Sequence, residues 1–309
     1  MSDLNQIDDE KDNLDLAYWL AMSCTDSNKT LEILDKAASQ GHIQSIHKLG
    51  EFFLEGKIVE EDYDKAAKLF EKAAMQGYAK SLKELYFMYE NGDVVCHNSD
   101  EFIELIEKFP DAFFEIGCAY LSGDRVEEDL ETAFNFFKNG ASKGSLKAKY
   151  YLGRMYFYGE GVEQNYNVAI KLIWEAAEEL PEAQSFLSAQ YFSGTGVEQD
   201  FEMSFGLAKE AVSRGYNDAK YILGILYISG NGVKRDTGKG RDLLEEAAKY
   251  GGPEISAQAK HALGLIYYKG QGAIKNIEKA KNFFKEACDA GESESCEMYE
   301  KIKKSEINK

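Results

Sequence analysis

The chain contains 309 residues, of which 44% are hydrophobic, enough for one elongated repeat array or two compact domains. It carries 36 Lys and Arg against 54 Asp and Glu, and this net charge of −18 argues against nucleic acid and anionic membranes as partners. The five cysteines are irregularly spaced and form no CxxC pair, which argues against a disulfide framework and a structural zinc site.

The N-terminal residues 1–13 are acidic, and we predict that they are disordered. They lack the basic start and the apolar stretch of a secretory signal, and no run of 18 apolar residues follows, so we predict a cytoplasmic protein. Residues 14–41 are predicted to form N-terminal capping helices. They comprise an amphipathic segment, Leu14–Met22, and a stretch, Asn28–Gln40, that matches the second helix of the repeat described next.

Residues 42–291 consist of about seven copies of a unit of roughly 36 residues. Each unit opens with the pattern A-x-x-x-L-[GS]-x-x-Y-x-x-G, whose small, Leu, small and Tyr positions share one face of a helix. Small residues in the first and third columns allow a neighbouring helix to approach closely, and the final Gly suits a left-handed helix end. The best copies are Ala148–Gly159, Ala183–Gly194, Ala219–Gly230 and Ala259–Gly270. A degenerate copy, Lys80–Gly92, is followed by a shortened second half, Asp93–Pro110.

A turn, Gly-x-Gly-Val in its best copies, separates this first helix from a second one. The second helix is predicted to begin at an Asp or Asn whose side chain caps free N–H groups, each cap contributing about 1 kcal/mol. These caps are Asp62, Asn98, Asp129, Asn165, Asp200, Asp236 and Asn276. Four residues after the cap comes a column of alanines, to which we assign Ala66, Ala133, Ala169, Ala208 and Ala280. Residues 292–309 are predicted to form a C-terminal capping helix, Ser293–Lys304, and a tail.

The combined pattern A-x-x-x-L-G-x-x-Y-x-x-G-x-G-V-x-x-[DN], followed by A-x-x-x-[FY]-x-x-A-A-x-x-G, resembles the Sel-1-like repeat, a relative of the tetratricopeptide repeat. The resemblance covers residues 42–291. It implies an all-α fold, a right-handed α/α superhelical solenoid of antiparallel helix pairs. It also implies a role as an adaptor or scaffold for protein complexes, in a family with many bacterial members.

The last unit is similar to the cysteine-rich branch of this family, because Ala287–Cys296 reads ACDAGESESC. In that branch every repeat carries two cysteines at this spacing, and some members have been reported to bind or hydrolyse β-lactams. The resemblance implies a Cys288–Cys296 disulfide as one possibility. Here only the last unit has the pair, because the helix-end column holds residues such as Ala248 and Val212 elsewhere.

No pattern in the chain predicts catalysis. The four histidines show neither metal-ligand spacing nor a nucleophile arrangement, and they are His42, His47, His97 and His261. His47 and His261 occupy the same helix column, which we expect to face the surface. The Gly-x-Gly turns follow helices rather than strands, so we interpret them as turns and not as nucleotide-binding loops. We therefore expect no catalytic residue, no metal and no cofactor.

Tetratricopeptide relatives bind partners in a concave groove lined by first helices, in columns three before, one after and four after the central small residue. The residues that this comparison assigns to partner binding are Tyr150, Arg154, Phe157, Phe192, Tyr221, Ile225, His261 and Tyr268. The competing interpretation is that these side chains pack against adjacent helices. Carboxylates at the rim of the groove are expected at Glu51, Glu55, Glu90 and Glu160.

We therefore predict a non-catalytic scaffold or adaptor that binds a protein or peptide, with the acidic surface favouring a basic partner. Three alternatives stay open at this point. They are a bacterial immunity protein that neutralises a basic toxin, a β-lactam-binding hydrolase like the cysteine-rich branch, and an effector exported into a host cell.

Overall fold

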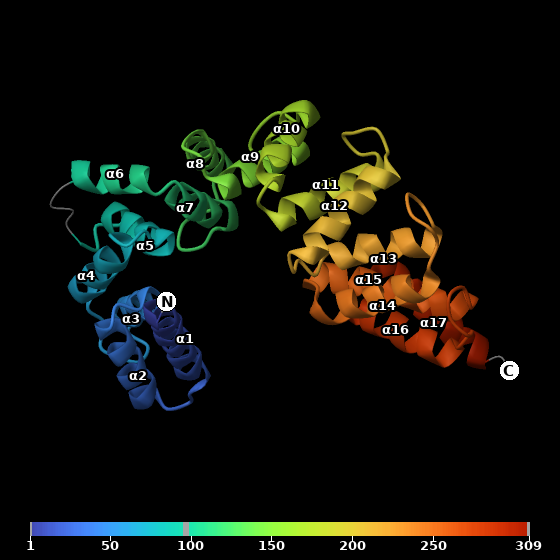
Figure 1. Ribbon diagram of the computed structural model, residues 1–309, viewed down its shortest axis with the longest axis horizontal. Coiled ribbons are helices and arrows are strands. Elements are labelled where there is room, and N and C mark those ends of the chain that lie inside the picture. Colours follow the sequence, from blue (N-terminus) through green and yellow to red (C-terminus); the bar gives the residue numbers. More distant parts are fainter. Residues whose placement is uncertain (1, 95–98, 308–309) are drawn as a thin grey trace. The chain divides into compact units, whose positions relative to one another are not determined.

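The computed structural model describes residues 2–94 and 99–307, which form 17 helices and no strand (Figure 1). The helices are packed as sequential pairs, so the predicted all-α architecture is confirmed. Cys96, His97 and the predicted cap Asn98 lie outside the described residues. The chain divides between Ala148 and Lys149 into two compact units, and nothing in the repeat pattern marks this division.

Unit 1 is built from helices that each pack against a neighbour in the chain. They are α1 (Ser2–Ser23), α2 (Ser27–Ser39), α3 (Ile43–Glu55), α4 (Tyr63–Ala74), α5 (Ala79–Glu90), α6 (Ser99–Lys108), α7 (Asp111–Ser122), α8 (Leu130–Ser142) and the start of α9 (Leu146–Tyr158). First helices α5 and α7 also contact each other directly. Phe102 of α6 packs edge-on against Tyr89 of α5, which holds the two halves of the degenerate repeat together.

Helix α1 begins at Ser2, whereas the sequence led us to expect disorder up to residue 13. It runs for 22 residues without a break into the amphipathic segment that starts at Leu14. Adding residues to an existing helix requires no new nucleation, which is the costly step of helix formation. The packing of Tyr18 and Ala21 near α2 supplies the anchored part from which the helix extends backward.

Unit 2 contains the remainder of α9 and eight further helices. They are α10 (Tyr166–Ala177), α11 (Pro181–Ser193), α12 (Phe201–Ser213), α13 (Ala219–Ser229), α14 (Thr237–Tyr250), α15 (Pro253–Lys269), α16 (Ile277–Asp289) and α17 (Ser293–Ile307). From α10 onward each helix packs against the next one. First helices α11, α13 and α15 also contact one another in that order.

In five helix pairs, a glycine in the central column of the first helix packs against the residue 20 positions later in the second helix. A Cβ atom added to Gly50 would lie 2.6 Å from the Phe70 ring, and one added to Gly264 would lie 2.6 Å from the Phe284 ring. The other glycine pairs of this kind are Gly117 with Phe137, Gly153 with Ile173, and Gly224 with Leu244. The large partners are fully buried, so this contact forms the centre of each repeat.

One repeat satisfies the same contact with different residues. Its central small residue is Ser188, and the residue 20 positions later is Ala208. Helix α12 begins after the cap Asp200, so Ser204 and not Ala208 occupies the alanine column, and our assignment of Ala208 to that column was wrong. The Ser188 hydroxyl donates to the Ser204 carbonyl at 2.9 Å, and the Ser204 hydroxyl donates back at 2.8 Å. The larger serine is accommodated because its partner is a small alanine.

The predicted caps join the two helices of each pair at their shared turn. Six of the seven predicted cap residues accept a backbone N–H in the first turn of their helix, and Asn98 is outside the described chain. Each of these six also donates its own N–H to the carbonyl of the Tyr-column residue in the first helix, as Asn165 does to Tyr156 at 2.8 Å. The Asp26 side chain likewise accepts N–H groups in the first turn of α2, a cap that was not predicted from the sequence.

The close contact at Gly264 leads to a stability prediction. We expect Gly264→Ala to destabilise unit 2 by about 1–3 kcal/mol, because the new methyl group meets the buried Phe284 ring. Gly206→Ala in α12 is the matched control, since nothing lies within 4 Å of its Cβ position. That substitution should stabilise the helix by roughly 0.5–1 kcal/mol. Urea unfolding followed by circular dichroism measures both, and shifts of the same sign in the two variants would contradict the prediction.

Candidate partner-binding surface

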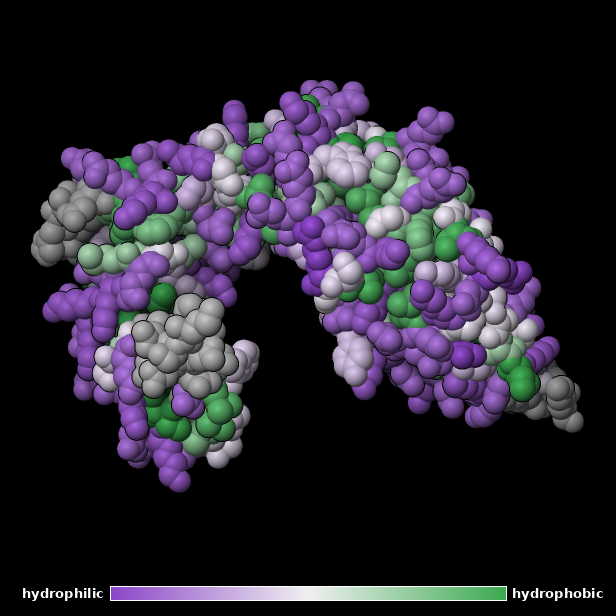
Figure 2. Space-filling view, viewed as in Figure 1, coloured by the Kyte–Doolittle hydropathy of each residue, from purple (hydrophilic) through white to green (hydrophobic). Residues whose placement is uncertain are grey.

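Hydrophobic residues form separate patches within a mostly hydrophilic surface on each unit (Figure 2). The predicted partner-binding residues all belong to unit 2. They fall into two groups, those whose side chains are covered by the next helix pair and those that keep one side exposed.

Tyr150 and Phe157 of α9 belong to the covered group, with exposed fractions of 8% and 4%. Both rings pack edge-on against Phe186 of α11, with centroid distances of 6.1 Å and 5.1 Å. Burial also raises the pKa of the Tyr150 hydroxyl, against the opposing effect of the Arg154 charge. At these two positions the packing interpretation is the one that the structure supports, because α11 supplies a large aromatic side chain to fill the column.

Arg154 lies between these residues on α9 and is half-buried. Its guanidinium carbon is 5.4 Å from the centroid of the Tyr151 ring, 5.8 Å from Tyr150 and 5.9 Å from Tyr158. Its Nε atom is buried without a hydrogen-bond partner. Tyr158, one turn further along the helix, is 50% exposed, so the aromatic surroundings of Arg154 are open on one side.

The half-exposed group lies on α11, α13 and α15, which contact one another in sequence. The side chains of Tyr221, Ile225 and Ile228 pack with one side against the cluster formed by Leu244 and Leu263. We call this set the first-helix surface of unit 2, and its residues are Phe192, Tyr221, Ile225, Ile228, Leu265 and Tyr268.

An acidic edge borders this surface at Tyr221. Burial raises the pKa of the Tyr221 hydroxyl, and the negative charges of Glu292 and Glu294 raise it further. Glu294 lies in the first turn of α17, so the closing helix contributes negative charge to the first-helix surface. Sequence reasoning did not identify this contribution, because α17 follows the last complete repeat.

The two histidines in the shared helix column do not face the surface, so that expectation was wrong. Each ring contacts the next first helix, where Nδ1 shares a hydrogen bond with a serine 34 residues later: His47 with Ser81 at 2.9 Å, and His261 with Ser295 at 2.7 Å. Each also packs on the large residue of its own repeat, His47 on Phe70 and His261 on Phe284. The column is covered because successive first helices lie side by side.

The predicted rim carboxylates have different surroundings. Glu90 and Glu160 are exposed. Glu55 pairs with Lys57 at 2.9 Å and lies 3.6 Å from Arg125. Arg125 also pairs at 2.8 Å with Glu84, a carboxylate that is only 3% exposed. The sequence did not single out Glu84, because its partner comes from the turn before α8, 41 positions later in the chain.

Glu51 is the most strongly perturbed of these carboxylates. Burial by itself raises its pKa, but hydrogen bonds from His47 and Lys48, together with their charges, outweigh burial and lower the pKa from 4.5 to about 2. Lys48 donates at 2.6 Å, and the His47 Nε2 atom lies 3.3 Å away. Ionised Glu51 is therefore paired with His47 and Lys48 inside unit 1, and it is not an unpaired carboxylate at the rim of a groove.

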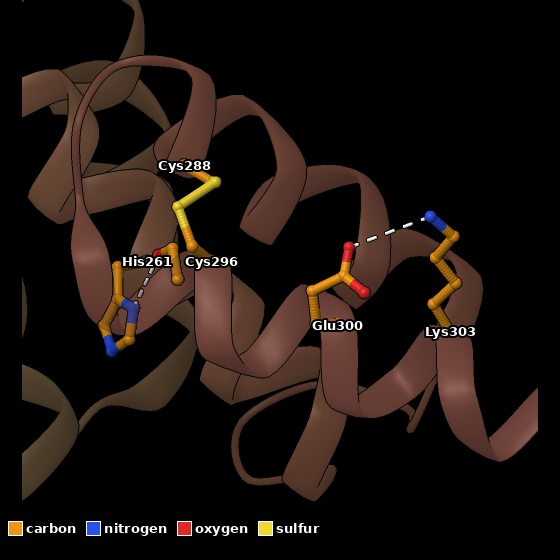
Figure 3. The surroundings of a disulfide bond; sticks show 6 residues. His261, Cys288, Cys296, Glu300 and Lys303 are labelled. Atoms are coloured by element: carbon orange, nitrogen blue, oxygen red, sulfur yellow. Dashed lines mark hydrogen bonds and ion pairs between the residues drawn. A yellow bond between two sulfur atoms is a disulfide. The ribbon is translucent and has the colours of Figure 1, made fainter.

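Cys288 at the end of α16 and Cys296 in α17 form a disulfide with a sulfur–sulfur distance of 1.98 Å (Figure 3). On the same helix, Ser295 holds His261 of α15, and Ile302 is buried against the cluster around Phe284. The bridge therefore attaches the closing helix covalently at the end where it begins.

The described ranges contain no group of three or more His, Cys, Asp or Glu side chains placed to hold a metal ion. Among the same residues, no helix combines the length and hydropathy needed to cross a membrane.

The Glu51 network predicts a pH-dependent stability. A folded-state pKa near 2, below the ordinary 4.5, means that ionised Glu51 stabilises unit 1 above about pH 4.5 and that this contribution disappears as the pH falls toward 2. Glu51→Gln should therefore lower the free energy of unfolding at about pH 7 by up to roughly 3 kcal/mol, and the difference should vanish toward about pH 2.

Thermal unfolding of both proteins across this pH range tests the effect. Glu104→Gln, at an exposed position of α6 in the same unit, is the control and should change little. A deficit in Glu51→Gln that persists undiminished at low pH would show that the carboxylate charge is not responsible.

The disulfide predicts a local effect of reduction. Breaking the Cys288–Cys296 bond should destabilise the docking of α17 by about 2–3 kcal/mol, because the bond restricts the unfolded chain. In a repeat array each unit contacts only its neighbours, so the loss should be confined to the C-terminal helices. Hydrogen exchange with and without reductant measures this, with α11 and α12 as the internal control. Equal exchange of α17 in both conditions would refute the prediction.

The comparisons with known proteins agree with this architecture. The family model of the Sel1 repeat matches residues 25–42, 43–78, 110–145, 146–179, 181–216, 217–251 and 257–292. The unmatched stretch between 78 and 110 contains the degenerate copy recognised from the sequence. The first match, 25–42, covers α2, which was assigned to the capping region.

Solved structures with the same fold include a Sel1 repeat protein from Oxalobacter formigenes, which is 26% identical at a TM-score of 0.57. The match covers 97% of this chain and 90% of that protein's chain. The protective antigen c5321 of uropathogenic Escherichia coli, which displays an SLR fold, is 24% identical at a TM-score of 0.57 over 95% of this chain. This chain spans 65% of the length of that antigen. The immunity protein Pa5087 of Pseudomonas aeruginosa is 20% identical at a TM-score of 0.42, over 76% of this chain and 80% of its own.

The central small-to-large contact recurs in five repeats, and the family model matches more than half of the chain. This protein therefore belongs to the Sel1 repeat family and contains seven Sel1 repeats.

Proposed function

We propose that this Sel1 repeat protein is a non-catalytic scaffold that binds a segment of a protein partner along the first-helix surface of unit 2. The observation that carries the proposal is the row of half-exposed aromatic and aliphatic side chains on adjacent first helices. Tyr and other large apolar side chains supply most binding energy at protein interfaces when a partner covers them. The row on α11, α13 and α15 offers such groups in a spacing that suits a helix or an extended segment.

Charge supports the same proposal and describes the partner further. The net charge of −18 steers positively charged proteins toward the chain, so we propose a partner that is basic overall. Glu292 and Glu294, close enough to Tyr221 to affect its hydroxyl, place negative charge at the edge of the surface. Neutralisation of a basic toxin and action as an exported effector are two settings in which this binding would operate.

The surface is tested by substituting its exposed residues. The triple variant Phe192→Ala, Ile225→Ala and Tyr268→Ala should weaken partner capture at least about tenfold, because truncating such residues removes contacts worth more than 1 kcal/mol each. Phe157 is left unchanged because it is buried and its loss would disturb the core. The partner is identified with the wild-type chain by affinity capture and mass spectrometry, and its affinity for each variant is then measured in solution.

The matched control is Tyr250→Ala on α14, whose ring is 55% exposed on a second helix. We expect it to bind the partner like the wild type. The triple variant should melt at a somewhat lower temperature, because Ile225 and Tyr268 pack with one side against the core, but all variants should be folded under the conditions of the binding measurement. Unchanged affinity in the triple variant, or an equal loss in the control, would place the interface elsewhere.

A second candidate function, β-lactam hydrolysis, is favoured by one observation, the Cys288–Cys296 disulfide shared with the cysteine-rich branch. Nitrocefin turnover by the oxidised chain distinguishes the two functions, since a binding scaffold should show none.

The disulfide also bears on the cellular location of the protein, because such bonds persist in oxidising compartments. We therefore propose a periplasmic or extracellular location as the alternative to the cytoplasmic one expected from the sequence. Cell fractionation and thiol labelling of Cys288 and Cys296 distinguish the two locations.

A further inference from the structure

Among the described arginines, Arg154 is the one that is half-buried and has no acidic partner. Three of the other four pair with carboxylates, Arg125 with Glu84 and Glu55, Arg214 with Glu210, and Arg241 with Asp242 and Glu245. The fourth, Arg235, is exposed to solvent. Arg154 is half-buried, forms no ion pair within 4.0 Å among the described residues, and has a buried Nε atom without an acceptor. In a chain with 54 acidic residues, this side chain lacks the acceptor that its geometry requires.

The surroundings of Arg154 hold the guanidinium in place without satisfying its hydrogen bonds. The rings of Tyr150, Tyr151 and Tyr158 lie within 5.9 Å of the guanidinium carbon and stabilise its charge through their π faces. Aromatic faces accept no strong hydrogen bond in the plane of the guanidinium, where its N–H groups point. The Nε–H group is buried, so a ligand reaches Arg154 through its two Nη groups, which are not buried and form no hydrogen bond to the described residues.

A carboxylate is the acceptor that fits this arrangement. Guanidinium and carboxylate groups match in a bidentate geometry, and such charge-assisted pairs are among the strong hydrogen bonds of proteins. A phosphate carries more charge and is usually bound by several basic groups. The neighbouring cation on α9, Lys149, is already paired with Glu175 at 2.9 Å, which leaves Arg154 alone at this position.

We propose that Arg154, framed by Tyr151 and Tyr158, is the binding site for one carboxylate, an Asp or Glu side chain within an apolar segment of the protein partner. The exposed half of the Tyr158 ring offers a contact for an apolar residue next to that carboxylate. The acidity of the chain as a whole opposes a run of acidic residues, so the segment carries a single carboxylate in otherwise apolar or basic surroundings. This inference rests on the proposed binding function, since it names a feature of the partner.

The test uses the full chain as bait for a random peptide library displayed on phage, followed by affinity measurements on the selected peptides by fluorescence polarisation. We expect an Asp or Glu at one constant position beside an apolar residue. Arg154→Gln should lower the affinity of such a peptide about 10- to 100-fold, the loss expected for a hydrogen bond to a charged group. Arg235→Gln removes the same charge from an exposed position and should leave the affinity within about twofold of wild type.

Two further measurements do not depend on the folding of Arg154→Gln. Replacing the acidic residue of the peptide by its amide should produce the same loss on the wild-type chain. The charges can also be exchanged by combining Arg154→Glu with a Lys at that peptide position. This combination should bind more tightly than either change alone. Melting temperatures of the variants show whether unit 2 stays folded.

The outcomes separate this inference from the function on which it rests. If no peptide is selected by the wild-type chain, the proposed binding function itself is overturned. If peptides bind along the first-helix surface but tolerate the amide and Arg154→Gln, the carboxylate site alone is wrong. A phosphoserine at the acidic position that binds more than about tenfold tighter than Asp would instead assign the site to phosphate.

Discussion

The structure depends on one close contact, in which a glycine or serine of a first helix receives a large or matched side chain from the second helix 20 positions later. At Gly50, Gly153 and Gly264 there is no room for a Cβ atom beside the partner side chain. Where Ser188 replaces the glycine, the partner shrinks to Ala208 and two serine hydroxyls bond across the interface. The larger central residue is thereby matched by a smaller partner, so that the two helices still meet without overlap. Because the two helices of a pair are held at this distance, each pair becomes a rigid unit that can stack on the next.

Stacking then decides which first-helix side chains remain accessible. In the column three residues before the central small residue, His47 and His261 bond to serines of the next first helix and Tyr150 packs on Phe186, whereas Tyr221 stays half-exposed. In the columns one and four residues after it, Ile225 and Tyr268 are half-exposed, whereas Phe157 is buried. Fewer first-helix side chains are therefore accessible to a partner than the repeat columns alone predict. The surface that supports binding is the part of each column that the adjacent helix pair fails to cover.

Arg154 and the C-terminal disulfide show how local substitutions give individual repeats separate roles. Arg154 occupies the column that holds Ile225 and Leu265 in later repeats, so a single change places a cation among tyrosines. The disulfide lies at the last matched repeat, at the end of α16. It joins the last complete repeat to a helix that otherwise docks mainly through Ile302, Ser295 and neighbouring side chains. In both cases the pairing of the two helices in the repeat is unchanged.

The sequence by itself determined the helices, their order and their pairing, because these follow from local periodicity, from caps such as Asp62 and Asn165, and from small residues at fixed spacing. Only the tertiary structure decided which predicted binding residues are accessible, that Glu84 is buried against Arg125, and that Arg154 has no acidic partner. The periodicity of one repeat describes one helix pair, whereas burial and ion pairing at these positions depend on side chains that the neighbouring repeats contribute. Those neighbours are about 35 residues away in the chain and obey no local rule, so their effect appears only when the pairs are stacked.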